Sequence, residues 1–222
     1  MNERVSDLVY IPRYGAFTRV NHWITAACFI LLTFSGLAMF HPVFFWAASL
    51  FGGGQATRTI HPWIGLVLFV SYALLFICFA TSNWPNRDDV EWSRRIVDVI
   101  NNREENLPEL GKYNAGQKSV FWSQAALIIV LLVTGLLIRD WYFYGLTTIP
   151  QKRIAVLIHS LAAIFAITII IVHIYSAIWV RGTMRAMTRG TVTIGWAYRH
   201  HRRWLRDYLA QTAPAPRRTG SD

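Results

Sequence analysis

The chain has 222 residues, of which 54% are hydrophobic and 15% are charged, and its formal net charge is +10. Soluble domains contain about 25% charged residues, so the composition excludes an ordinary soluble domain and requires apolar and charged residues to be segregated along the chain. The two cysteines, Cys28 and Cys78, both lie in apolar sequence. They exclude a disulfide framework, an iron-sulfur cluster and covalent attachment of haem through a CxxCH motif.

Four stretches lack Asp, Glu, Lys and Arg, and every charged residue lies between or outside them. A helix that crosses the ~30 Å hydrocarbon core needs about 20 mostly apolar residues, so each stretch is long enough for one span. The uncharged stretches are residues 20–57, 59–86, 119–138 and 154–180.

We therefore predict an all-α membrane protein with a four-helix bundle. His41-Pro42 and the glycines from Gly52 interrupt the first stretch after one span, which leaves an interfacial loop with a short amphipathic turn. Residues 90–100 mix apolar and polar side chains in a pattern typical of a surface helix. Residues 1–210 are predicted to form one transmembrane domain, and residues 211–222 a disordered tail. The predicted spans are residues 20–40, 61–80, 119–138 and 154–179.

The basic residues predict the orientation of the bundle. Four spans place both termini on one side of the membrane, and eighteen of the twenty-two basic residues then lie on that side. Cytoplasmic loops carry an excess of Lys and Arg, so both termini are predicted to be cytoplasmic. Topology and attraction to anionic lipid account for the basic tail, and no nucleic-acid partner is expected.

Five of the seven histidines lie in the uncharged stretches, where the predicted topology gives each a depth. His22 lies at the cytoplasmic end of the first span and His61 at the outer end of the second. His159 and His173 are both in the fourth span, 14 residues and therefore ~21 Å apart, on nearly one helix face. Matching depths pair His61 with His159 on the outer side and His22 with His173 on the inner side.

Two imidazoles that face each other from different helices are what a six-coordinate haem b iron requires. The spans contain no charged residue for a proton or ion pathway, and each depth offers too few ligands for tetrahedral zinc. Gly36 lies at the outer level, where it leaves room for a porphyrin. We predict two haems b; the alternative is that the histidines are hydrogen-bonded packing residues. The remaining histidines, His41, His200 and His201, are interpreted as interfacial or surface residues.

Short segments around these histidines form a recognisable pattern that extends from about Arg19 to Tyr208. Its most specific part is the block Gly111–Lys118, which reads GKYNAGQK. Together the segments resemble the cytochrome b (gamma) subunit of membrane-bound formate dehydrogenases, within the group of di-haem cytochromes b that also serves nickel-iron hydrogenases. The other matching segments are Asn21-His22-Trp23, Ile60-His61-Pro62, Leu157-Ile158-His159, Val172-His173-Ile174-Tyr175 and His200-His201-Arg202-Arg203-Trp204.

The resemblance implies a subunit of the bacterial cytoplasmic (inner) membrane that docks to an iron-sulfur (beta) subunit, which meets a molybdenum or tungsten catalytic (alpha) subunit. The family's haem ligands fall on His61 and His159 for the outer haem and on His22 and His173 for the inner haem. Electrons from formate, oxidised in a partner, would pass through both haems to menaquinone or ubiquinone at the cytoplasmic side and contribute to the proton motive force.

The block from Tyr113 to Lys118 leads into the third span at the depth of His22 and His173. Asn114 and Gln117 can hydrogen-bond a quinone carbonyl, Gly116 lets a flat ring approach the backbone, and a helix N-terminus favours negative charge. With the resemblance, these residues are the predicted quinone site. The alternative is that Asn114 only caps the third helix.

Haem propionates need cationic or hydrogen-bonding partners. The candidates are Arg19 and Lys118 on the inner side and Arg58 and Arg153 on the outer side. Two rival functions remain open at this point. A nickel-iron hydrogenase or another molybdoenzyme would use the same haems with a different partner, whereas a small transporter or a membrane anchor would hold no cofactor.

Overall fold

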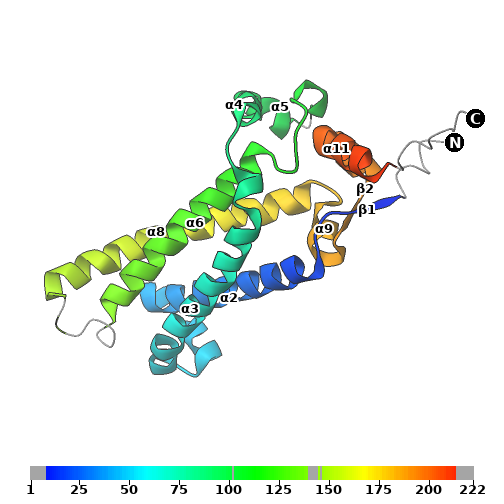
Figure 1. Ribbon diagram of the computed structural model, residues 1–222. Coiled ribbons are helices and arrows are strands. Elements are labelled where there is room, and N and C mark those ends of the chain that lie inside the picture. The colour runs from blue at the N-terminus through cyan, green and yellow to red at the C-terminus, as the bar shows by residue number, and fades with distance from the viewer. Residues whose placement is uncertain (1–8, 102, 140–144, 146, 214–222) are drawn as a thin grey trace, which may run out of the picture.

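The computed structural model describes residues 9–101, 103–139, 145 and 147–213. Four helices in this part of the chain are long and apolar enough to cross a membrane, which confirms the four predicted spans (Figure 1). They are α2 (Ala16–Phe40), α3 (Gly54–Phe79), α6 (Ala115–Ile138) and α8 (Ile149–Trp179).

Each helix begins several residues before the predicted span. The uncharged stretches mark only the part that suits the hydrocarbon core, whereas the helices continue beyond it and include Arg19, Arg58 and Lys118 among their first five residues. Long basic side chains can lay their stems along apolar surface and still keep the charge at the membrane boundary. The end of α2 at Phe40 agrees with the prediction, because Pro42 disfavours helix at the preceding residue.

The long helices form two hairpins, with α2 packed along α3 and α6 packed along α8. Within the first hairpin, Asn21 donates to the backbone carbonyl of Ser71 at 2.8 Å and accepts from the Ser71 hydroxyl at 2.7 Å. The Tyr72 hydroxyl of α3 donates to the carbonyl of Phe121 of α6 at 2.6 Å and joins the hairpins. A polar side chain in hydrocarbon needs such a partner, so these bonds fix the register of the bundle.

The connection between α2 and α3 is the 3-10 helix η1 (Pro42–Phe51). Gly52 and Gly53 follow it with φ angles of 86° and 101°, which favour glycine. The predicted short turn in the interfacial loop is therefore a ten-residue helix, and it marks one end of the bundle (the distal end).

Short elements gather at the opposite end of the bundle (the terminal end; Figure 1). Strand β1 (Tyr10–Pro12) pairs antiparallel with β2 (Thr191–Thr193), and these strands are the departure from the all-α prediction in the described residues. The short helices are η2 (Thr81–Asn83), α4 (Arg87–Arg94), α5 (Ile96–Ile100), η3 (Glu104–Asn106), α9 (Thr183–Arg189), α10 (Ile194–His200) and α11 (Arg202–Thr212). Helix α11 enters the predicted tail 211–222, and residues 214–222 lie outside the described part.

His201 lies inside this end and not at the surface, so its interpretation as a surface residue is wrong. Its side chain is 1% exposed, and its Nδ1 lies 2.7 Å from the carbonyl oxygen of Gly111. The Arg13 guanidinium lies 4.5 Å from the ring centre of Trp204 and 4.9 Å from that of Trp196. The strand pair joins residues 10–12 to residues 191–193 beside the loop before α6, and this packing buries the imidazole.

Candidate functional site

The four histidines of the spans form two facing pairs across the hairpins. The ring centres of His61 (α3) and His159 (α8) are 6.3 Å apart at the distal end, with the ring planes at 64°. Those of His22 (α2) and His173 (α8) are 6.5 Å apart at the terminal end, at 52°. The structure thus brings together the same pairs that depth predicts, and α8 contributes one ring to each.

The separations suit a metal ion between two trans imidazoles. A metal–imidazole bond is about 2.0–2.1 Å long and the ring centre lies about 1 Å behind the nitrogen, so two such ligands place their ring centres about 6 Å apart. In the described residues, no group of three or more His, Cys, Asp or Glu is placed to hold a metal ion. The remaining ligands of an iron between these rings would come from a cofactor, as a porphyrin supplies them.

A glycine lies beside each ring of the distal pair. A Cβ atom on Gly36 of α2 would be 3.6 Å from Cε1 of His61, and one on Gly135 of α6 would be 3.4 Å from Cε1 of His159. Larger side chains at either position would crowd the imidazole. Gly36 therefore lies at the level that the sequence predicts, where it leaves space around His61.

The residues before these glycines contact the same rings, and sequence reasoning missed both. The Ser35 hydroxyl lies 2.7 Å from Nδ1 of His61, and the Thr134 hydroxyl lies 2.9 Å from Nδ1 of His159. The signal is the hydroxyl-glycine dipeptide, which occurs about 25 residues before a histidine in both hairpins.

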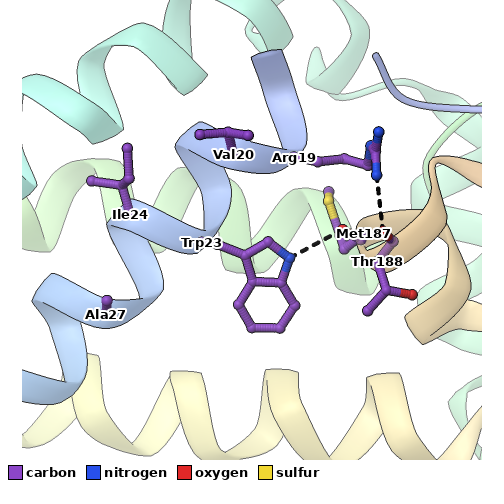
Figure 2. Close-up of a pocket in the computed structure, with 7 residues that line it drawn as sticks. All are labelled: Arg19, Val20, Trp23, Ile24, Ala27, Met187 and Thr188. Carbon is purple, nitrogen blue, oxygen red and sulfur yellow. Dashed lines mark hydrogen bonds between the residues drawn. The ribbon is translucent and has the colours of Figure 1, made fainter. Parts of the chain in front are cut away.

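The surroundings of His22 differ. Its Nδ1 is buried and has no hydrogen-bond partner within the described part of the chain. The neighbouring Trp23 packs edge-on, with 5.5 Å between the ring centres. Trp23 also lines a cavity of about 520 Å³ between α2 and α9. Figure 2 shows its indole directed at the backbone of α9. The cavity is lined by Arg19, Val20, Trp23, Ile24, Ala27, Met187 and Thr188.

The four basic residues predicted to bind haem propionates differ in their partners and their exposure. The Arg19 guanidinium donates to the carbonyl of Thr188 at 2.9 Å (Figure 2). Lys118 is buried, and its ammonium lies 2.8 Å from a carboxylate oxygen of Asp89. This ion pair holds α4 against α6. The two distal candidates, Arg58 and Arg153, are exposed.

Asn114 and Gln117 form a capping box at the start of α6. The Asn114 side-chain oxygen accepts from the Gln117 backbone N–H at 2.9 Å, and the Gln117 side-chain oxygen accepts from the Asn114 N–H at 3.0 Å. The structure confirms that Asn114 is the N-cap. Because the cap uses only the oxygens, the side-chain NH₂ groups can still donate to another acceptor.

The flat ring at Gly116 belongs to the protein itself. A Cβ atom on Gly116 would lie 3.1 Å from Cη2 of Trp92, and Trp92 is buried. Sequence reasoning assigned this space to a quinone ring, because it could not place the surface helix α4 next to α6. In the structure, the absence of a side chain at Gly116 lets the Trp92 indole pack on the first turn of α6.

The capping box lies at the level of His173. Gln124 of α6 donates to the carbonyl of Ala166 of α8 at 3.1 Å, which sets the antiparallel register of the two helices. Gln117 precedes Gln124 by seven residues, and His173 follows Ala166 by seven residues. Because the two helices are antiparallel, Gln117 lies opposite His173. The amide groups at the start of α6 and the terminal histidine pair therefore share one depth.

Buried polar groups support the block that contains the capping box. The Arg13 guanidinium donates to the carbonyl of Lys112. Burial raises the pKa of Tyr113, and burial together with Arg13 lowers the pKa of Lys112. Burial and the charge of Arg13 also lower the pKa of His201 well below its usual value. Each shift disfavours the charged form of its group, because burial removes the group from water.

Four membrane-spanning helices with facing imidazole pairs define the chain as a membrane cytochrome b. The chain belongs to the prokaryotic cytochrome b561 family, whose model matches residues 13–190. With its four spans, it is a multi-pass protein of the bacterial inner membrane.

Its relatives are formate dehydrogenase subunits, which confirms the resemblance seen in the sequence. The chain is 44% identical to the formate dehydrogenase cytochrome b556(fdo) subunit of Escherichia coli (strain K12), over 91% of this chain and 95% of the relative. It is 40% identical to the nitrate-inducible cytochrome b556(Fdn) subunit of the same strain, over 89% and 91%. It is 37% identical to the formate dehydrogenase cytochrome b556 subunit of Haemophilus influenzae, over 91% and 85%.

Proposed function

We propose that this chain is the membrane cytochrome b subunit of a formate dehydrogenase complex, in which it carries electrons from an iron-sulfur (beta) subunit to quinone. The observation that carries the proposal is the presence of two facing imidazole pairs, one near each end of the bundle. The relatives are formate dehydrogenase subunits over nearly their whole length, which favours a molybdenum or tungsten catalytic (alpha) subunit as the source of electrons.

His61 and His159 would hold one haem iron at the distal end, and His22 and His173 would hold the other at the terminal end. When bound, two haems b would supply one-electron carriers at these positions. Helix α8 fixes their spacing, because its two histidines are 14 residues apart and thus ~21 Å apart along the axis. This distance covers most of the ~30 Å hydrocarbon core.

The terminal end faces the cytoplasm in this proposal. The excess of basic residues in the terminal-end segments supports that orientation. The distal end then faces the outer side, where the iron-sulfur subunit docks. Moving one charge against the membrane potential costs about 2.3 kcal/mol per 100 mV. Electron transfer from the outer side to the cytoplasmic side therefore conserves part of the redox energy as proton motive force.

Asn114 and Gln117 hold the quinone, menaquinone or ubiquinone, at the level of His173. Their side-chain NH₂ groups donate to a quinone carbonyl, while the capping box fixes their orientation. The N-terminus of α6 stabilises the negative charge that develops on reduction. Gly116 contributes by admitting Trp92 as a flat wall beside the amides. For the haem propionates, Arg58 and Arg153 are the exposed distal candidates, and Arg19 and Lys118 are the terminal ones.

The test is the optical spectrum of the complex purified with its native partners. We expect a b-type spectrum, two haems per chain and reduction of both by formate. The absence of haem would point to an anchor or a transporter and overturn the proposal. Reduction by hydrogen but not by formate would replace the partner with a hydrogenase.

A further inference from the structure

The two hairpins repeat one arrangement around the distal histidines. In the first, Ser35 of α2 contacts Nδ1 of His61 of α3, and in the second, Thr134 of α6 contacts Nδ1 of His159 of α8. Ser35 is 0% exposed and Thr134 is 6% exposed, so water does not replace either contact. The Nδ1 atom of each imidazole thus contacts a hydroxyl of its own hairpin, and the ring faces the imidazole of the other hairpin.

The contacts of the two hydroxyls fit one tautomer of both imidazoles. Ser35 Oγ lies 2.8 Å from the carbonyl oxygen of Leu31, and Thr134 Oγ1 lies 2.6 Å from that of Val130. A carbonyl oxygen can only accept and a hydroxyl has one hydrogen, so a hydroxyl that donates to the carbonyl of its own helix has only lone pairs left for the imidazole. It must then accept from the imidazole, which places the ring proton on Nδ1 and leaves the Nε2 lone pair for a metal.

We infer that Ser35 and Thr134 are positioning residues that hold His61 and His159 as iron ligands and lower the reduction potential of the distal haem. The inference rests on the proposed function. A ligand imidazole that donates its second N–H becomes a more basic ligand, and a more basic ligand stabilises ferric iron. Hydrogen bonds to axial ligands are one of the protein's means of setting a haem potential.

The terminal pair supplies the contrast. His22 Nδ1 has no hydrogen-bond partner in the part of the chain that the structure describes, whereas both distal rings have one. We expect the distal haem to be the lower in potential, because both of its ligands have a hydroxyl partner and His22 has none in the described residues. Electrons then pass from the haem of lower potential at the distal end to the haem of higher potential at the terminal end. Quinone reduction next to His173 requires this direction.

The experiment measures both haem midpoint potentials and the ferric low-spin EPR signals in the purified complex. The key variants are Thr134→Val, which keeps the shape and removes the hydroxyl, and Thr134→Ser, which retains the hydroxyl. The matched control is Thr33→Val, because the Thr33 hydroxyl donates to the carbonyl of its own helix, that of Phe29, at 2.9 Å. The two potentials are assigned to ends of the bundle by the loss of one component in His159→Ala and the other in His22→Ala.

We expect Thr134→Val to shift the distal potential to a more positive value and to move the distal EPR signal, because the His159 ring loses its hydroxyl partner. Thr134→Ser and Thr33→Val should keep both at the wild-type position. An unchanged distal potential in Thr134→Val, or an equal shift in Thr33→Val, would overturn the inference. If Thr134→Val loses the distal haem, a distal haem that is retained in Thr134→Ser supports the inference. Loss of the distal haem in both variants overturns it.

Ser35→Ala provides a second measurement if Thr134→Val fails to assemble. It removes only the Ser35 hydroxyl oxygen next to His61, and we expect the same positive shift of the distal potential. An unchanged distal potential would contradict the inference. The outcomes separate the two proposals. A wild-type complex without haem overturns the proposed function, whereas two haems with unmoved potentials in the variants overturn only the part assigned to the hydroxyls.

Discussion

The Gln124 side chain donates a hydrogen bond to the backbone carbonyl of Ala166, at the midpoint between the two histidines of α8. Ala166 is 1% exposed, so α6 lies close against α8 at this point. Because α8 contributes one imidazole to each pair, this single contact sets the position of both. It also places the start of α6 at the depth of His173.

Substitution of Ala166 by Leu should disturb both histidine pairs. Overpacking a tight contact typically costs about 1–3 kcal/mol, and α8 must move away from α6 to admit the larger side chain. We expect a lower unfolding temperature and a reduced content of both haems in the purified complex. Ile164→Leu is the control, since Ile164 is exposed on the same helix. Full haem content in Ala166→Leu would show that the helix contact does not position the rings.

The quinone assignment is tested by Asn114→Asp. Aspartate caps a helix as well as asparagine does but lacks the NH₂ donor, so stability should be kept while quinone reduction slows. Both haems should remain reducible by formate. Asn86 caps α4 through the same kind of box, so Asn86→Asp is the matched control and should leave quinone reduction unchanged. Normal quinol formation in Asn114→Asp would remove this residue from the site.

The buried His201 should make the terminal end sensitive to acid. Burial and Arg13 hold its pKa well below the usual value of 6.5, so the unfolded chain binds a proton that the folded chain does not. Stability is then full above about pH 6.5 and falls as the pH drops below it. We expect the unfolding temperature of the wild type to decrease below this pH and that of His201→Gln to depend less on pH.

His41→Gln is the control for that experiment, because His41 is exposed. It should follow the wild-type pH dependence. Equal pH dependence in His201→Gln and the wild type would show that the His201 imidazole is not the group that titrates.

The sequence predicted the features that depend on one helix at a time. The lengths of the uncharged stretches gave the spans, and the helical repeat placed His159 and His173 on one face at two depths. The contacts of Ser35 and Thr134 were missed because they depend on how neighbouring helices are rotated. The burial of His201 was missed because it requires residues 10–12 to pair with residues 191–193, which are far apart in the sequence.

The central claim is that the two imidazole pairs each hold one haem b. The most direct measurement is the number of haems per chain in the wild type, in His159→Ala and in His22→Ala. We predict two haems in the wild type and one in each variant, with the distal haem absent from the first and the terminal haem absent from the second. An unchanged haem content in both variants would contradict the ligand assignment.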